Sequence, residues 1–107
     1  MQEVEFHAFV EAHRAGAFVV DVREPHEYHR GHVPGARLVP LGVVPLRLDE
    51  FPRDQPVYVI CASGHRSYTA AQHMATAGVD ARSVRGGTQM WRQNGHPLST
   101  GSHPTAD

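Results

Sequence analysis

The sequence predicts an α/β fold in which a mostly parallel sheet is covered by helices on both faces. Two kinds of segment alternate along the chain: nearly continuous apolar runs of strand length, at residues 17–22 and 56–62, and stretches with apolar side chains at helical spacing. A continuous apolar run is typical of a strand buried on both faces of a parallel sheet. Strands that alternate with short helices predict this architecture. With 107 residues, the chain forms one domain with one modest core.

The first elements follow in order. Residues 6–13 carry apolar side chains at helical spacing, and Gly16 marks the end of that helix. The strand over residues 17–22 comes next. Pro25 suits a first helical turn and Gly31 suits the exit, so we expect a short helix between them.

The middle of the chain contains one weak and one strong strand. Residues 36–41 form a short extended piece closed by Pro40. Between residues 41 and 51 the apolar side chains are dense, but Pro45 limits any helix to a short one. Residues 56–62, with the sequence PVYVICA, are the second strong strand.

A longer helix follows and is expected to begin at Arg66 or Ser67 and to stop at Gly78. Its spacing predicts one apolar face, made by Tyr68, Ala71, Met74 and Ala75. Residues 81–86 indicate a weaker strand, and residues 88–95 a last short helix. Residues 99–107 lack apolar anchors, so we expect a folded domain over residues 1–98 and a flexible C-terminal tail.

Composition excludes several classes of function. The formal net charge is −1, so nothing in the composition suggests a nucleic-acid-binding surface. No apolar run approaches the roughly 20 residues that span a bilayer, so we expect no membrane segment. The N-terminus carries acids and no basic region before an apolar core, which argues against a secretory signal. The single cysteine cannot form an internal disulfide, which agrees with a cytoplasmic location.

That cysteine, Cys61, lies where the second strong strand ends, at the edge where parallel sheets bind ligands. The loop CASGHR leads from it into the next helix, so several backbone N–H groups can point inward beside the positive end of the helix dipole. Such a concave loop favours an anion. Gly64 permits a positive φ, and Ala62 and Ser63 keep the loop uncrowded.

The loop predicts that Cys61 is a nucleophile. A free thiol has a pKa of about 8.5, which a helix N-terminus and nearby cations lower to roughly 3.5–7.5. Arg66 offers a guanidinium fork suited to an oxyanion, and His65 adds charge only when protonated. The alternative is that Cys61 is a small buried hydrophobe, the commoner fate of a lone cysteine.

Further polar and aromatic residues raise other candidate sites. Asp21 and Arg23 end the first strong strand, where they either support the loop and guide anionic donors or form a structural ion pair, which we favour. Trp91, after Gly86 and Gly87, is expected to pack in the core. The two glycines are expected to allow a tight turn close to the cysteine loop. Because no phosphate-binding pattern accompanies them, we expect no cofactor.

Three histidines raise the question of a metal site. His26, His29 and His32 are spaced three residues apart, and the first two can share a helix face. Gly31 and Pro34 place His32 in a turn outside that helix. We therefore expect no metal at these histidines.

From Val4 to Leu98 the sequence resembles the rhodanese homology domain. Three segments carry the resemblance in matching order: VVDVREPHEYHRGHVPGARLVPL, VYVICASGHRS and VRGGTQMWRQNGHPL. It implies a central parallel sheet of about five strands flanked by helices. It also implies a sulfurtransferase, in which a loop cysteine takes sulfane sulfur from a donor such as thiosulfate as a persulfide. Cyanide or a thiol then accepts the sulfur.

Carried over residue by residue, the resemblance makes Cys61 the nucleophile and assigns its cradle to Ala62, Ser63, Gly64, His65, Arg66 and Ser67. It also places His32 in a turn, where it implies a structural hydrogen bond. Other members are phosphatases and arsenate reductases, whose loop has five residues between Cys and Arg, whereas four intervene here. A sulfur-relay module loaded by a partner protein is the main alternative. A silent binding module typically lacks the cysteine, and a redox sensor usually needs a resolving cysteine, which this chain lacks.

Overall fold

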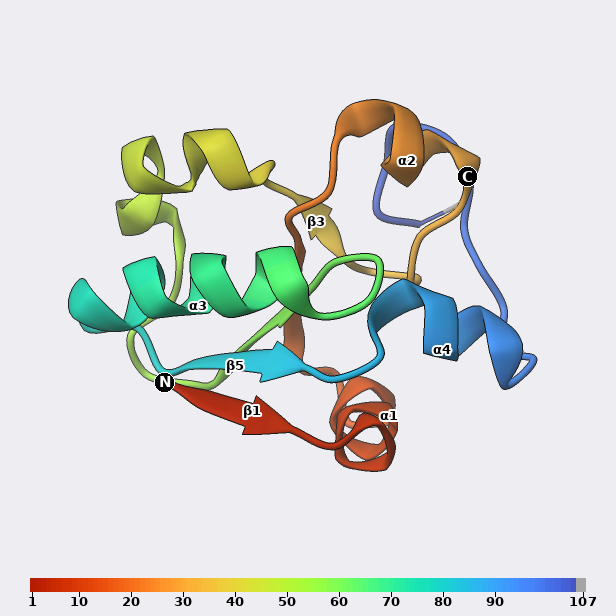
Figure 1. Ribbon diagram of the computed structural model, residues 1–107, viewed down its shortest axis with the longest axis horizontal. Coiled ribbons are helices and arrows are strands. Elements are labelled where there is room, and N and C mark those ends of the chain that lie inside the picture. The colour runs from red at the N-terminus through yellow and green to blue at the C-terminus, as the bar shows by residue number, and fades with distance from the viewer. Residues whose placement is uncertain (106–107) are drawn as a thin grey trace.

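The computed structural model describes residues 1–105 and builds them around a five-stranded parallel sheet with the strand order β1-β5-β4-β2-β3 (Figure 1). The strands are β1 (Gln2–Val4), β2 (Phe18–Asp21), β3 (Arg37–Leu38), β4 (Val57–Ile60) and β5 (Ala81–Val84). The α-helices are α1 (Phe6–Arg14), α2 (Pro25–Arg30), α3 (His65–Thr76) and α4 (Gly87–Gln93). Two 3₁₀ helices, η1 (Leu41–Leu46) and η2 (Leu48–Glu50), follow β3. The α/β fold predicted from the sequence is confirmed.

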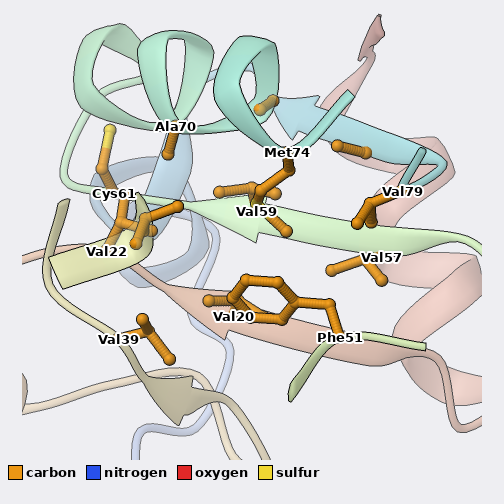
Figure 2. Close-up of a cluster of buried hydrophobic side chains, with 13 residues drawn as sticks. Val20, Val22, Val39, Phe51, Val57, Val59, Cys61, Ala70, Met74 and Val79 are labelled. Atoms are coloured by element: carbon orange, nitrogen blue, oxygen red, sulfur yellow. The ribbon is translucent and has the colours of Figure 1, made fainter. Parts of the chain in front are cut away.

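The sheet separates two apolar clusters. In one cluster, Val59 of β4 packs with Ala70 and Met74 of α3 (Figure 2). The 3₁₀ helix η1 contacts α3 and covers the same face. In the other, Ile60 packs with Phe9 of α1 and Trp91 of α4. Figure 1 shows α3 and α1 on opposite sides of the sheet. Because consecutive residues of β4 face opposite clusters, its apolar run is continuous rather than alternating.

Parallel strands bring Cys61 to the edge of the sheet where the carboxyl ends meet. β4 lies between β2 and β5, and Ile60, the last residue of β4, pairs in register with Asp21. The N–H of Val22 donates to the Ile60 carbonyl at 2.9 Å. Cys61 follows directly, and Figure 2 shows its sulfur turned toward α3. The fold therefore fixes the thiol between two neighbouring strand ends and a helix.

Two local features differ from the sequence prediction. β1 was not predicted, because its three residues are mostly polar and exposed at the sheet edge, so they carry no apolar pattern. The expected place of Tyr68 on the buried face of α3 is wrong, since its side chain is 40% exposed. The residues buried along α3 are Ser67, Ala70, Ala71 and Met74. This face keeps helical spacing but includes a polar residue that packs beside Cys61.

The segment after the last helix folds back toward α2. His32 and Ser99 exchange backbone hydrogen bonds of 2.8 and 2.9 Å, and the Gly35 N–H donates to the Pro104 carbonyl. The ring of His32 is buried, with Nδ1 2.8 Å from the Tyr28 carbonyl, as the predicted structural hydrogen bond requires. The flexible tail over residues 99–107 stays a prediction, and residues 106–107 lie outside the described part.

None of the helices within residues 1–105 is long and apolar enough to cross a membrane. The longest of them, α3, has 12 residues, whereas a spanning helix needs about 20. A cytoplasmic location stays a prediction.

Asp21 and Arg23 form a buried ion pair at the end of β2. The Arg23 guanidinium donates Nε to both carboxylate oxygens of Asp21 at 3.0 and 3.1 Å, and Nη2 to one of them at 2.8 Å. Nη2 also donates to the Gly31 carbonyl at 2.9 Å, which ties the exit of α2 to the sheet. The geometry favours the structural interpretation of this pair.

We expect Asp21→Ala to lower the free energy of unfolding by about 3–5 kcal/mol, because it leaves the buried guanidinium of Arg23 without its counter-charge. Urea denaturation measures the change. Asp80→Ala is the matched control, since Asp80 pairs with Arg82 at the surface and its loss is expected to cost less than about 1 kcal/mol. Similar losses in the two variants would contradict a special role for the buried pair.

Candidate active site

The loop after β4 wraps around the sulfur of Cys61. The Gly64 N–H donates to Sγ at 3.1 Å. Gly64 has φ 119°, so the positive φ predicted for it is confirmed, and α3 begins at the next residue. The sulfur is almost wholly buried, with Cys61 1% exposed. The loop thus directs backbone N–H toward the sulfur at the first turn of α3.

Two serine hydroxyls lie one behind the other between the Cys61 sulfur and the protein interior. Oγ of Ser67, on the first turn of α3, lies 3.4 Å from Sγ of Cys61. Oγ of Ser83, on β5, lies 2.9 Å from Oγ of Ser67. All three residues are buried. The resemblance pointed to Ser67, whereas sequence reasoning missed Ser83, because a serine within a weak strand gives no signal of what it faces.

The surroundings of Cys61 act on its pKa in opposite directions. Burial is the largest single influence and raises the pKa of the thiol, because the charged form loses water. Hydrogen bonds favour the thiolate; they come from the Ser67 hydroxyl and from backbone N–H groups of Ser67, Gly64 and Ser63. Together they outweigh burial and hold the pKa of Cys61 below its ordinary value. The thiolate is the nucleophilic form of cysteine.

The first turn of α4 donates hydrogen bonds to the loop after β4. The Thr88 N–H donates to the Cys61 carbonyl at 2.9 Å, and the Gln89 N–H donates to the Ala62 carbonyl at 3.0 Å. Gly87 permits this approach, because a Cβ there would lie 2.5 Å from the Cys61 oxygen and 2.6 Å from the Ala62 oxygen. The tight turn expected at Gly86 and Gly87, close to the cysteine loop, is therefore confirmed.

Arg66 forms an ion pair with Glu27, a contact that the sequence did not reveal. Its Nη1 and Nη2 donate to the two carboxylate oxygens of Glu27 on α2, at 2.7 and 2.9 Å. This hydrogen-bonded pairing with Arg66 is the main cause that lowers the pKa of Glu27 to about 2. The Nε–H stays free of this pair, so the guanidinium keeps a donor for an anion. Glu27 caps the start of α2, a local signal that says nothing of its contact with α3.

The remaining residues predicted for the cradle differ in exposure. Ala62 is half-buried, whereas Ser63 and His65 are exposed, and Nδ1 of His65 lies 3.5 Å from Oγ of Ser63. The Arg23 guanidinium faces Asp21 and Gly31. The structure thus places Gly64 and Ser67 in contact with the Cys61 sulfur and pairs Arg66 with Glu27. Arg23 supports the end of β2 and the exit of α2.

The three histidines of residues 26–32 do not converge. Nδ1 of His29 contacts the Pro25 carbonyl at 2.6 Å, while Nε2 of His32 contacts the carbonyls of His103 and Pro104 at 2.9 and 3.0 Å. Within residues 1–105, no three side chains of His, Cys, Asp or Glu are grouped so as to hold a metal ion.

The sequence matches the model of one known protein family. The sequence model of the Rhodanese-like domain matches residues 5–94. The chain belongs to the rhodanese-like domain family. A relative from Allochromatium vinosum, named Sulfurtransferase, is 36% identical over 81 residues, which cover 75% of this chain and 76% of that protein. Thiosulfate sulfurtransferase GlpE of Stutzerimonas stutzeri is 35% identical over 79 residues, 73% and 72% of the two chains.

Solved structures agree on the fold of this rhodanese-like domain. The crystal structure of a rhodanese-related protein from Thermoplasma volcanium is similar, with a TM-score of 0.87 and 29% sequence identity. The superposition covers 94% of this chain and 100% of that one. The rhodanese-like fold is thus shown, and the names of the relatives support a sulfur-transferring family.

We expect Gly87→Ala to destabilise the domain and to disturb the loop, because its Cβ overlaps two loop carbonyl oxygens. Gly95→Ala is the matched control: its φ is also positive, at 78°, but a Cβ there meets nothing within 4 Å. The control is expected to cost about 1 kcal/mol from its backbone conformation alone. Gly87→Ala is expected to cost about 1–3 kcal/mol more, through overpacking. Urea denaturation compares the two, and equal costs would contradict the close approach of α4.

The Glu27 and Arg66 pair predicts a loss of stability in acid. The folded pKa of Glu27, about 2, lies below the ordinary 4.5, so its charge stabilises the fold above about pH 4.5 and less as the pH falls toward 2. The difference in unfolding free energy between the wild type and Glu27→Gln is expected to be about 1 kcal/mol near neutral pH, since water reaches the pair. Denaturation from about pH 7 to about pH 3 should show this difference shrinking.

Glu11→Gln serves as a control for this acid effect, because Glu11 pairs with Arg14 at an exposed site. We expect its effect to be small at every pH. A difference for Glu27→Gln that stays constant down to about pH 3 would show that packing, rather than charge, holds Arg66.

Proposed function

We propose that this domain is a thiosulfate sulfurtransferase that carries sulfane sulfur as a persulfide on Cys61. The observation that carries the proposal is the Gly64 N–H aimed at Sγ from 3.1 Å, in a loop that lowers the pKa of the thiol. A nucleophile that must hold negative charge before and after reaction gains from fixed N–H donors. The named sulfurtransferase relatives support the same chemistry.

In the first half-reaction, the Cys61 thiolate attacks the outer sulfur of thiosulfate. A bond forms between Sγ and that sulfur, the S–S bond of thiosulfate breaks, and its electron pair leaves on sulfite. The enzyme then carries a cysteine persulfide anion. Arg66 contributes through the Nε donor that Glu27 leaves free, which suits the oxyanion end of the donor.

In the second half-reaction, cyanide or a thiolate attacks the outer sulfur of the persulfide. The S–S bond breaks, the electron pair returns to Sγ of Cys61, and thiocyanate or a new persulfide leaves. The same N–H donors stabilise the thiolate before loading and after discharge, so the enzyme works in two alternating steps. No proton, metal or cofactor is needed to balance either step.

The length of the loop favours sulfur over phosphate chemistry. Four residues separate Cys61 from Arg66, whereas the phosphatases and arsenate reductases of the family have five. A shorter loop encloses a smaller space, which suits a sulfur atom better than a tetrahedral phosphate. The alternative within sulfur chemistry is a relay module that a partner protein loads.

Intact mass spectrometry tests the proposal. The reduced protein is incubated with thiosulfate and then with cyanide. We expect a gain of one sulfur atom, its discharge as thiocyanate, and no gain in Cys61→Ser, because Cys61 is the only thiol in the chain. Cys61→Ala is the second control, since it removes the polar group altogether.

Three outcomes are distinguishable. Loading by thiosulfate and discharge to cyanide support the sulfurtransferase. Loading only by a persulfide-bearing donor protein would replace it with the relay module. No loading from either donor would contradict sulfur transfer through Cys61.

A further inference from the structure

The sulfur of Cys61 and the hydroxyls of Ser67 and Ser83 form a buried chain of contacts. Sγ of Cys61 lies 3.4 Å from Oγ of Ser67, and Oγ of Ser67 lies 2.9 Å from Oγ of Ser83. Cys61 and Ser83 are each 1% exposed, and Ser67 is fully buried. The three residues come from the end of β4, from α3 and from β5. Bulk solvent therefore barely reaches these three residues.

The hydroxyl hydrogen of Ser83 determines the direction of the hydrogen bonds in this chain. Among the described residues, Oγ of Ser83 has one hydrogen-bond partner, Oγ of Ser67. A buried hydroxyl that cannot donate leaves an unsatisfied hydrogen, which is costly. Either hydroxyl of this contact could be the donor, and donation from Ser83 to Ser67 avoids that cost. The oxygen of Ser67 then accepts from one side, and its own hydrogen is left to point at the sulfur.

The opposite arrangement has a different effect on Cys61. In that arrangement Ser67 donates to Ser83, and the protonated thiol of Cys61 donates to Oγ of Ser67 at 3.4 Å. The sulfur would then have to keep its proton and donate it, which favours the neutral thiol. The direction of the two hydroxyls thus selects between thiol and thiolate, and a chain of hydrogen bonds that points one way strengthens each member.

We propose that Ser83 is a positioning residue that orients the Ser67 hydroxyl toward Cys61 and so stabilises the nucleophilic thiolate. Ser83 does not touch the sulfur and acts only through Ser67. Its importance for turnover rests on the proposed function, but its effect on the thiol does not, since ionisation of Cys61 needs no sulfur donor.

The test is the pH dependence of Cys61 alkylation by iodoacetamide, which reports the thiolate without any sulfur transfer. We expect Ser83→Ala to raise the apparent pKa of Cys61 by about half a unit and Ser67→Ala by about one unit. The double variant is expected to match Ser67→Ala alone, because Ser83 has no other route to the sulfur. Ser99→Ala, which alters a buried serine of the C-terminal segment, is expected to leave the profile unchanged.

Each result decides the proposal. An unchanged profile in Ser83→Ala overturns it, and so do shifts of Ser83→Ala and Ser67→Ala that add in the double variant, because addition means that Ser83 acts independently of Ser67. Urea denaturation of each variant confirms that the compared proteins are folded. A shifted profile in a protein that takes no sulfur from any donor would contradict the proposed function while the role of Ser83 stands.

Discussion

In the loop after β4, carbonyl groups and an N–H group point in opposite directions, and the site depends on this arrangement. The carbonyls of Cys61 and Ala62 point toward α4 and accept its first N–H groups, while the Gly64 N–H points to the sulfur. Gly87 allows α4 to come that close, and Gly64 allows the chain to turn. Because the carbonyls are already bonded elsewhere, the loop presents donors rather than acceptors to the thiol.

The burial of Cys61 has two opposite effects on the charge of its thiolate. Burial disfavours the charge on Cys61, yet it also shields the hydrogen bonds that favour this charge from competing water. Further out, two ion pairs fasten α2 to the site. Asp21 holds Arg23 against the exit of this helix, and Glu27 joins the helix to Arg66. The thiol of Cys61 thus lies among strand ends, helices and ion pairs that come from separate parts of the chain.

The sequence was informative where a residue's role is local. The apolar runs predicted β2 and β4, and the loop after β4 predicted an inward-pointing backbone N–H beside Cys61 and a positive φ at Gly64. Contacts between distant segments were not predictable, because periodicity does not encode them. Glu27 shows only its capping position, and Ser83 only a place in a weak strand. Tyr68 was misplaced for the same reason, since Ser67 takes the buried position opposite Cys61.

The source of the loop's donors also bears on how such a domain diversifies. Gly64 offers the sulfur its backbone N–H, and the side chains of Ser63 and His65 reach solvent. Substitutions at these two exposed positions alter the shape and charge of the surface beside the loop but leave the peptide groups in place. Under the proposed function, selectivity for the incoming molecule depends on these side chains, whereas the reactivity of the thiol depends on the peptide groups of the loop. A lineage, or a directed-evolution library, can change the first while inheriting the second.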